Sequence, residues 1–360
     1  MPLSGRITIV DVARRAAVSR QTVSRVLNGN PSVAADTHAR VQCAIDELHF
    51  VPNRAARCLH GRPVMAVGLF VPFSSGQIAA NNFFSEVIAS ISETCSRNGT
   101  YLNLLCFEDA NPDPERIIRL YREKSIRGLI VTCPGEDDPL LQSLVRYRIP
   151  CVVIGRPPVP DHTIRVDFDV GKIARDCTRH LLDLGHRRIA FLNGPSFMTY
   201  SSDLLDGYRR ELEAEGIPYD PMLVRETNLL EASGDEMAAA LFEEAPGFSA
   251  IFSANDHLAL GAMKAAARAG RSIPRDLSLV SGSWSTWNAL LAPALTAMRS
   301  NYGELGRVAI RQLLRLISEK PDRIPNEESE EASKADGIPV SFILESCLEP
   351  GESCARYGGM

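Results

Sequence analysis

The sequence predicts an all-α helix-turn-helix head followed by a two-lobed α/β core built on doubly wound parallel sheets. Two short amphipathic helices joined by a tight turn fall within residues 8–28, and strands alternate with helices from residue 65 onward. Charge is also divided unevenly: residues 1–62 hold nine arginines, no lysine and four acidic residues, whereas the whole chain has a net charge of −5. A basic head on an acidic body is typical of a DNA-binding protein with a separate sensing domain.

Length and composition limit the class of protein. The chain has 360 residues, too many for one small core, and its 45% hydrophobic and 23% charged residues are ordinary for a globular protein. We find no apolar run long enough to span a membrane and no signal-peptide core, so we expect a cytoplasmic protein. The nine cysteines are scattered without a Cys-x-x-Cys pair or metal-ligand spacing. Free thiols and no metal site are expected.

The first helix of the head begins near Thr8. Thr8 can cap it, and Asp11 three residues later completes a pattern that resembles a capping box. The apolar residues that follow lie on one face at helical spacing: Val12, Ala13 and Ala16.

The second helix has an apolar stripe and a polar face. Ser19 caps it, and Val23, Val26 and Leu27 form the stripe. The residues outside the stripe are Arg20, Gln21, Ser24, Arg25 and Asn28. Arginine and glutamine suit bidentate hydrogen bonds to guanine and adenine edges, and the short side chains of Thr22 and Ser24 can reach phosphates. Periodicity alone also fits a generic three-helix bundle with a solvated polar face.

A third helix is predicted over residues 35–49. Val41, Ile45 and Leu48 recur at helical spacing, and Pro52 prevents its continuation.

The head resembles the LacI/GalR family of bacterial repressors. The run Asp11-Val-Ala-x-x-Ala-x-Val-Ser19-x-x-Thr22-Val-Ser-Arg-Val-Leu-Asn28 matches that family's signature, and Arg40-Val…Ile45-x-x-Leu48…Val51-Pro-Asn-x-x-Ala56-Arg-x-Leu59 continues it in register. The resemblance implies that Arg20 and Gln21 read bases in the major groove. It implies that a further set positions the DNA backbone: Ser19, Thr22, Ser24, Arg25, Asn28 and Thr37.

The resemblance also implies a hinge helix after a head of residues 1–52. The hinge covers residues 53–61, with Asn53 and Ala56 at the DNA and Leu59 as a wedge in a minor-groove step. So short a helix is marginal alone in water, so we expect it to order on DNA beside its dimer mate.

Three positions depart from the family pattern. Ala17 stands where glycine is usual in the turn, and alanine is less tolerant of a positive φ. Ala34 stands where a serine usually caps the third helix, a loss of about 1 kcal/mol. Phe50 replaces a tyrosine whose hydroxyl could touch phosphate.

The core, residues 62–346, shows strand and helix patterns in alternation, which implies parallel sheets with right-handed crossovers. The predicted elements are residues 65–71, 83–97, 101–106, 114–124, 128–132, 140–148, 150–155, 171–184, 188–192, 204–215, 250–253, 258–269 and 277–281. We expect lobe 1 to hold residues 62–165 and 301–325, and lobe 2 to hold residues 166–297 and 338–346. The strand-like 339–344 segment is expected in lobe 2, an acidic loop at 326–337, and a tail at 347–360 without coiled-coil heptads.

The core resembles the periplasmic-binding-protein-like domain of the same family, so an effector site is expected between the lobes, at the carboxyl ends of the strands. The matching positions place these effector-binding residues: Phe83, Phe84, Arg156, Asn255 and Asp256. Asp167 fits the segment that enters lobe 2, and residues 185–190, including His186, fit a scaffold motif without chemistry.

Two charged effector ligands of the family are absent. Leu204 stands where an arginine is usual, three residues before Gly207-Tyr208. Ser283 and Trp284, which we assign to the effector site, stand where an aspartate pair is usual. Without bidentate charged hydrogen bonds, a site with these residues, Trp287 and the phenylalanine pair favours a flatter or more apolar ligand than a simple sugar. The alternative is a decayed site and constitutive repression.

The resemblance implies a homodimeric repressor that binds a pseudo-palindromic DNA operator and responds to a small-molecule effector. Three alternatives stay open: an enzyme, a solute-binding protein, and an architectural DNA-binding protein with an inert body. Nucleotide-binding, zinc-hydrolase and nucleophile-elbow motifs are absent, and no cofactor is expected. The basic head argues against a solute-binding protein.

Overall fold

The computed structural model describes residues 7–27, 30, 32–50, 65–79, 81–106, 113–135, 137–157, 163–319 and 341–358. The chain divides into two compact units, Met1–Met65 and Ala66–Met360, and each is described by itself.

The first unit, the head, is a three-helix domain around a small apolar core. Its helices are α1 (Ile9–Arg15), α2 (Arg20–Leu27) and α3 (Ala35–Glu47). The helical spacing predicted most of the buried residues, and Ala44 of α3 and Phe50 from the segment after α3 join them: Val12, Ala13, Ala16, Val23, Val26, Val41, Ala44 and Phe50. The predicted stripe residues Leu27, Ile45 and Leu48 are only partly buried against this cluster. Phe50 is therefore a core residue, which gives its apolar ring a structural reason.

Local signals set the helix ends in the head. The Asp11 carboxylate accepts hydrogen bonds from the Thr8 N–H at 2.9 Å and the Thr8 hydroxyl at 2.7 Å. Ala17 in the α1–α2 turn has φ +53°, the left-handed conformation that the missing glycine would favour. Ala34 caps α3 without any side-chain hydrogen bond. Helix α3 ends two residues before the predicted 49, because His49 itself is left-handed at φ +49°.

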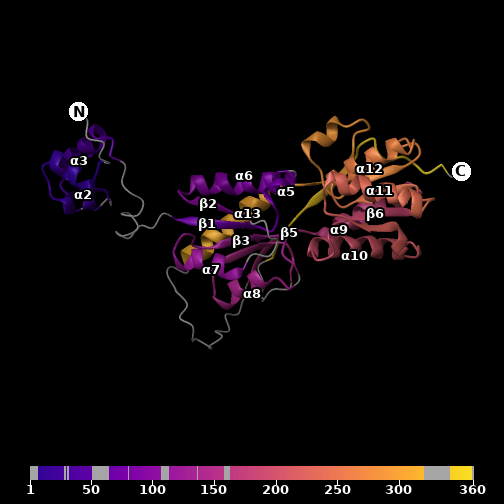
Figure 1. Ribbon diagram of the computed structural model, residues 1–360, viewed down its shortest axis with the longest axis horizontal. Coiled ribbons are helices and arrows are strands. Elements are labelled where there is room, and N and C mark those ends of the chain that lie inside the picture. The colour runs from indigo at the N-terminus through magenta and orange to yellow at the C-terminus, as the bar shows by residue number, and fades with distance from the viewer. Residues whose placement is uncertain are drawn as a thin grey trace. The chain divides into compact units, whose positions relative to one another are not determined.

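The second unit, the core, has two lobes, each built on a six-stranded sheet (Figure 1). The sheet of lobe 1 has the order β11-β5-β4-β3-β1-β2 and all its pairs are parallel. Its strands are β1 (Ala66–Val71), β2 (Tyr101–Cys106), β3 (Leu129–Thr132), β4 (Cys151–Ile154), β5 (Ile164–Phe168) and β11 (Ser341–Leu344).

Helices cover both faces of the lobe 1 sheet, as a doubly wound fold requires. Helices α6 (Asn82–Arg97) and α13 (Tyr302–Glu319) pack together on one face, and α7 (Pro114–Arg122) and α8 (Pro139–Arg146) pack together on the other (Figure 1). A short helix, α5 (Ser75–Ala79), precedes α6. Strands β1, β3 and β4 are buried along their full length, which explains their continuous apolar runs.

Lobe 2 has the sheet order β12-β10-β9-β8-β6-β7, with β12 antiparallel to β10 and the other pairs parallel. Its strands are β6 (Ile189–Asn193), β7 (Val224–Glu226), β8 (Ala250–Ser253), β9 (Ser278–Ser281), β10 (Thr296–Ser300) and β12 (Ser346–Glu349). Its helices are α9 (Val170–Asp183), α10 (Thr199–Ala214), α11 (Glu231–Glu244), α12 (Asp256–Arg268) and the 3-10 turns η1 (Pro221–Leu223) and η2 (Thr286–Leu290).

Close helix packing in lobe 2 explains the Gly207-Tyr208 pair. Helices α9 and α10 pack on one face of the sheet and α11 and α12 on the other (Figure 1). A Cβ on Gly207 would stand 2.4 Å from the Gly171 carbonyl oxygen, so only glycine allows this approach. The buried Tyr208 hydroxyl donates to the Ile189 carbonyl at 2.8 Å and ties α10 to β6.

The assignment of residues 339–344 to lobe 2 is wrong. Strand β11 pairs in parallel with β5 at the edge of the lobe 1 sheet, from Ser341 opposite Arg165 to Leu344 opposite Phe168. The chain crosses between lobes three times: after β5, after β10 and after β11. Strand β5 pairs with β4 on one side, and β11 pairs with its other side and so forms the edge of the sheet.

Residues 347–358 are not a free tail. Strand β12 extends the lobe 2 sheet, and Ser353 is fully buried. The Ser353 hydroxyl donates to the Leu279 carbonyl at 2.6 Å, and the His186 imidazole lies 3.1 Å from the Ala355 carbonyl. His186 thus helps to hold the C-terminal segment, in keeping with its predicted scaffold role.

Candidate DNA interface and interlobe cleft

Helix α2 presents a basic polar face opposite its buried stripe. Val23 and Val26 are buried, whereas Arg20, Gln21 and Arg25 are exposed on the other side. The helical spacing that predicted this division is confirmed by the burial of the stripe.

Ion pairing separates the arginines of the head into two sets. Arg14 lies 3.3 Å from Asp11, Arg15 lies 2.5 Å from Glu47, and Arg40 lies 3.8 Å from Asp36. Within the described part of the chain, Arg20 and Arg25 have no such acidic partner. The guanidinium groups of α2 are therefore free to bind an anionic or base-edge partner, because no internal contact competes for their donors.

The hydroxyl residues at the start of α2 have a local role. The Ser19 hydroxyl accepts the Thr22 N–H at 3.0 Å and lies 2.9 Å from the Thr22 hydroxyl, so Ser19 caps the helix. Ser24 and Thr37 are partly buried, Ser24 on α2 and Thr37 in the first turn of α3. The proposed DNA contacts of Asn28, Asn53, Ala56 and Leu59, and the hinge at 53–61, lie outside the described residues.

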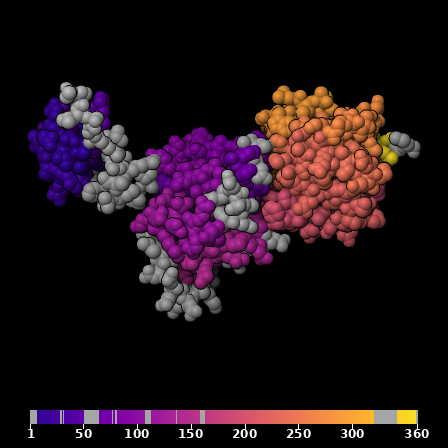
Figure 2. All heavy atoms as spheres, in the orientation of Figure 1, coloured from indigo at the N-terminus to yellow at the C-terminus, as the bar shows by residue number. Residues whose placement is uncertain are grey.

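A cavity lies between the two lobes, at the carboxyl ends of their strands. Measured to its open mouth, its volume is about 940 Å³. Lining residues follow β4 (Gly155), β8 (Asn255) and β9 (Gly282), or end β5 (Phe168) and β10 (Ser300). The two lobes, purple and pink to orange in Figure 2, meet along this boundary. The position at the carboxyl ends of the strands suits a small-molecule site.

Aromatic rings form much of the cavity wall. They are Phe73, Phe83, Phe84, Phe168, Tyr200, Trp284 and Tyr302. The centroid of the Phe83 ring lies 5.0 Å from Phe84 and 5.2 Å from Tyr302, both in edge-to-face contact. These contacts fix the rings in place, so the wall is pre-organised.

Most of the predicted effector residues meet in this cavity. Phe83, Phe84, Asn255 and Asp256 line it, and so do Ser283 and Trp284. The missing aspartate pair is therefore replaced by a hydroxyl and an indole at the wall itself.

Arg156, Leu204 and Trp287 do not line the cavity. Arg156 is exposed in the segment after β4. Leu204 is fully buried one turn after Tyr200 on α10. The Trp287 ring packs edge-to-face against His257, with centroids 5.7 Å apart. Helix α10 starts five residues before the predicted 204, and this earlier start brings Tyr200 to the wall.

The side chains of Asn255 and Asp256 form their hydrogen bonds within the protein. The Asn255 amide donates to the Leu229 carbonyl at 2.9 Å, and its oxygen accepts the Leu258 N–H at 2.9 Å, which caps α12. The Asp256 carboxylate accepts the Ser283 hydroxyl at 3.2 Å and the Ser285 hydroxyl. Burial raises the pKa of Asp256, which is 4% exposed, and the two serines oppose that shift.

Asp167 at the end of β5 is less well satisfied. Its carboxylate accepts one hydrogen bond, from the Phe168 N–H at 2.8 Å. Burial raises the pKa of Asp167 to about 7; the nearby Asp203 and Asp169 charges add to the rise, and Arg156 opposes it.

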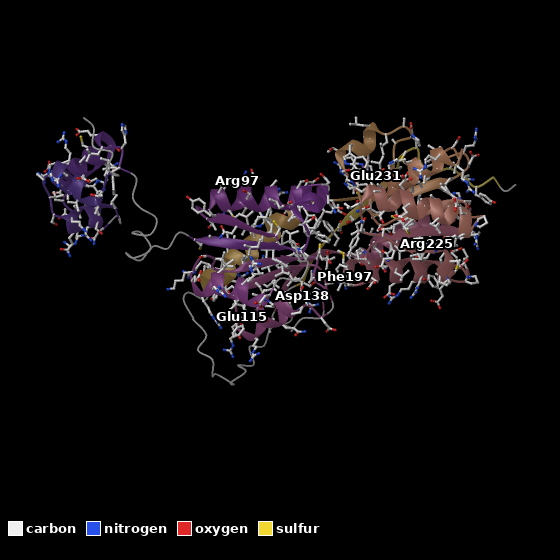
Figure 3. The ribbon with its side chains drawn as sticks, in the orientation of Figure 1. Arg97, Glu115, Asp138, Phe197, Arg225 and Glu231 are labelled. Carbon is white, nitrogen blue, oxygen red and sulfur yellow. The ribbon has the colours of Figure 1, made fainter. Side chains whose placement is uncertain are left out.

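The lobes touch beside the cavity. Gly135 of lobe 1 and Met198 of lobe 2 form an isolated antiparallel bridge, and the Thr199 hydroxyl lies 3.4 Å from the Pro134 carbonyl oxygen. Figure 3 labels Phe197 at this boundary. The Tyr200 hydroxyl then donates to the Ala254 carbonyl at 2.7 Å across the lobe 2 wall.

Sequence reasoning missed several lining residues, above all Tyr200, Tyr302, Phe168 and Leu229. Phe168 ends β5, just before the first crossover between the lobes, and Tyr302 begins α13, just after the second, so the positions of the crossovers could have pointed to both. Leu229 has φ +64° in a loop before a helix, α11, that the sequence did not predict. Its contact with the cavity had no local signal.

Among the described residues, no three His, Cys, Asp or Glu side chains are grouped as metal ligands. No helix of that same part of the chain is both long and apolar enough to cross a bilayer.

Two family models match this chain. Residues 8–53 match the bacterial regulatory proteins of the lacI family, and residues 178–334 match a periplasmic binding protein-like domain.

Whole-length relatives agree with both models. The chain is 33% identical over 350 residues to the HTH-type transcriptional regulator CelR of Thermobifida fusca, covering 97% of this chain and 98% of the relative. It is 30% identical to the HTH-type transcriptional repressor PurR of Haemophilus influenzae (strain PittEE), covering 94% and 98%.

Solved structures share the whole fold. A complex of the transcriptional regulator CelR with cellobiose has a TM-score of 0.70 and 31% identity, covering 97% of this chain and 100% of that chain. A lac repressor dimer bound to operator and the anti-inducer ONPF has a TM-score of 0.81 and 26% identity, covering 98% and 100%.

Proposed function

This chain belongs to the LacI family of bacterial regulatory proteins, and on that premise we propose that it is a cytoplasmic transcriptional repressor controlled by a small molecule. Two heads of a homodimer bind the half-sites of a pseudo-palindromic operator. An effector in the interlobe cavity changes the affinity of the heads for DNA. Regulators of this kind are not enzymes.

The observation that carries the DNA-binding proposal is the unpaired basic face of α2. Arg20 and Gln21 are exposed and have no acidic partner among the described residues. Three other arginines of the head, Arg14, Arg15 and Arg40, are held in ion pairs. Free bidentate donors on one helix face are what direct readout of base edges needs.

The test uses variants of the full chain. A preferred site is first selected from random double-stranded DNA, and affinities for it and its single-base variants are measured by fluorescence anisotropy. Arg20→Ala and Gln21→Ala should each relax preference at particular base pairs by about 1–3 kcal/mol. Arg15→Ala, whose guanidinium pairs with Glu47 instead, is the matched control and should keep the sequence preference. An equal loss on every sequence would contradict base reading by α2.

The chemistry of the cavity supports an effector other than a simple sugar. Leu204 is buried away from the wall, and Ser283 and Trp284 stand at the wall in place of carboxylates. Cellobiose is bound by the relative CelR. In this chain we expect thermal unfolding with cellobiose, common hexoses and pentoses to shift little, since no charged side chain grips sugar hydroxyls from these positions. A rise of several degrees with any of them would contradict this part of the proposal.

The cavity itself favours a responsive regulator over one with an inert core. A decayed site is expected to fill with side chains, because interiors pack densely. Here an open cavity remains between the lobes, and Asp167 in its wall accepts a single hydrogen bond.

A further inference from the structure

The formal charges of the cavity wall are one-sided. Asp167 and Asp256 line the cavity, and no Lys, Arg or His stands among its described lining residues. Two arginines lie beside the wall without lining it: Arg156 is exposed and its charge lowers the pKa of Asp167, and the Arg299 guanidinium lies over the Trp284 ring.

The two carboxylates differ in what they still need. Asp256 is bound by two serine hydroxyls and by its place at the start of α12. Asp167 has only the backbone N–H of its neighbour, and no arginine or lysine of the described residues forms an ion pair with it. Asp167 is only partly exposed, so its charged form would be favoured by any further hydrogen-bond donor or positive charge that a ligand brings. Asp167 is thus the carboxylate of the cavity wall that can still accept hydrogen bonds or an ion pair from a ligand.

The aromatic wall favours the same sign of charge. Ring faces carry negative potential and attract ammonium and guanidinium groups. One ring already does so: the Arg299 guanidinium carbon lies 4.5 Å from the centroid of the Trp284 ring. The lining thus holds two carboxyl groups and several aromatic rings, both of which favour a cationic over an anionic ligand.

We propose that the cavity binds an organic cation, an amine or quaternary ammonium group on an apolar body, with Asp167 as its counter-ion. The inference rests on the proposed function only for its effect on DNA; the binding itself follows from the wall. Neutral sugars could donate hydroxyls to Asp167, but they would gain nothing from the charge that the rings and the two carboxylates favour.

The binding test uses isosteres that differ in charge. The full chain is titrated calorimetrically and thermally unfolded with choline and benzyltrimethylammonium, with the neutral choline isostere 3,3-dimethyl-1-butanol, and with the anion 3,3-dimethylbutyrate, at equal ionic strength. We expect the two ammonium probes to raise the melting temperature by several degrees at millimolar concentration, and the neutral and anionic probes to shift it little. Equal shifts for choline and its isostere, or no shift with either ammonium probe up to 50 mM, would overturn the proposal.

Two variants place the effect at Asp167. Asp167→Asn should weaken binding of the ammonium probes at least tenfold, whereas Asp203→Asn, which removes a nearby carboxylate outside the wall, should weaken it less than threefold. Loss of equal size in both variants would contradict a specific counter-ion.

Thermal unfolding without ligand shows whether Asp167→Asn loses binding only because the variant is misfolded. The pKa of Asp167 is raised to about 7 by burial, so the folded state holds its proton more tightly than the unfolded chain does, and this group destabilises the fold as pH rises from about 4 through 7. The groups around it are Asp203, Asp169, Arg156 and Cys133, none of which changes in the variant. Asp167→Asn should therefore melt several degrees above wild type at pH 8, and the difference should shrink as the pH falls and nearly vanish near pH 4. A variant less stable than wild type at pH 8 would show that Asp167 is structural.

DNA binding separates this inference from the proposed function. Selected DNA that still binds with α2-dependent preference while no ammonium probe binds would overturn the cation site alone. Ammonium binding that leaves DNA affinity unchanged would support the cation site and contradict its role as the effector site.

Discussion

Helix α2 of the head and the interlobe cavity both carry polar residues, but they use them in opposite ways. On α2, Arg20, Gln21 and Arg25 point outward without internal partners. In the cavity, the side chains of Asn255 and Asp256 form hydrogen bonds with other groups of the protein. An exposed helix face can keep its donors free for a partner, whereas a concave site built from loop ends must first satisfy the polar groups that build it. Polar residues at a site are thus not all ligands.

The largest effect should come from breaking the core that supports the cavity. Phe191 is fully buried, stacks on Phe252 with centroids 4.5 Å apart, and contacts Tyr208. Phe191→Ala should cost about 3–5 kcal/mol of unfolding free energy by analogy with other buried aromatic truncations. Calorimetry should show the core transition at a lower temperature and the head transition unchanged. A joint shift of both transitions would mean that the two units do not fold independently.

The internal hydrogen bonds of Asp256 offer the next test. Ser285→Ala removes the hydroxyl that donates to the Asp256 carboxylate in a fully buried place. We expect a loss of about 1.5–3 kcal/mol in urea unfolding, the usual cost of a hydrogen bond to a charged group. Ser318→Ala, an exposed serine on α13, is the control. Equal stability of the two variants would show that Asp256 does not depend on its serines.

Tyr200 tests whether the cavity wall is held in place by its own contacts. Tyr200→Phe removes the 2.7 Å hydrogen bond to the Ala254 carbonyl and keeps the ring. The expected loss is about 0.5–1.5 kcal/mol, because a neutral hydrogen bond is removed without a new cavity. Unchanged stability in urea unfolding would indicate that the carbonyl finds another donor.

A gain is expected from the turn of the head. Ala17 has φ +53°, a conformation that costs an L-residue about 1–2 kcal/mol and glycine much less. Ala17→Gly should raise the unfolding free energy of the head by about 0.5–1 kcal/mol after the extra chain entropy of glycine is offset. Thermal unfolding checks this, and Ala16→Gly at the buried C-cap of α1, where φ is negative, should destabilise the head instead. A lower melting temperature for Ala17→Gly would contradict strain at the turn.

The smallest effect sharpens the comparison most. Because Gln21 is exposed and has no internal partner, Gln21→Ala should change the unfolding free energy by less than about 0.5 kcal/mol. The same variant should lose discrimination at particular base pairs of the selected site. A stability loss as large as that of Ser285→Ala would mean that Gln21, like the polar residues of the cavity, forms internal contacts that stabilise the fold.

Local periodicity predicted the elements well where one face of an element is buried. The predicted stripes of the three head helices face the small core, although Leu27, Ile45 and Leu48 are only partly buried. Strands such as β1 and β3 were predicted from their apolar runs. Helix α11 was missed because its apolar residues are spread around the helix with little one-sided burial. Strand β11 was assigned to the wrong lobe because its exposed and half-buried pattern says nothing about which sheet edge it meets.

The sequence by itself determined the polar face of α2, because helical spacing alone fixes which side chains share a face. It also determined the family of the chain, through the motifs of the head and the core. Only the tertiary structure decided the cavity. Asp167, Tyr200 and Tyr302 lie far apart in the chain and meet because three crossovers bring the carboxyl ends of two sheets together. The structure also decided which carboxylate stays open, since hydrogen-bond partners such as Ser285 are set by packing, not by sequence neighbours.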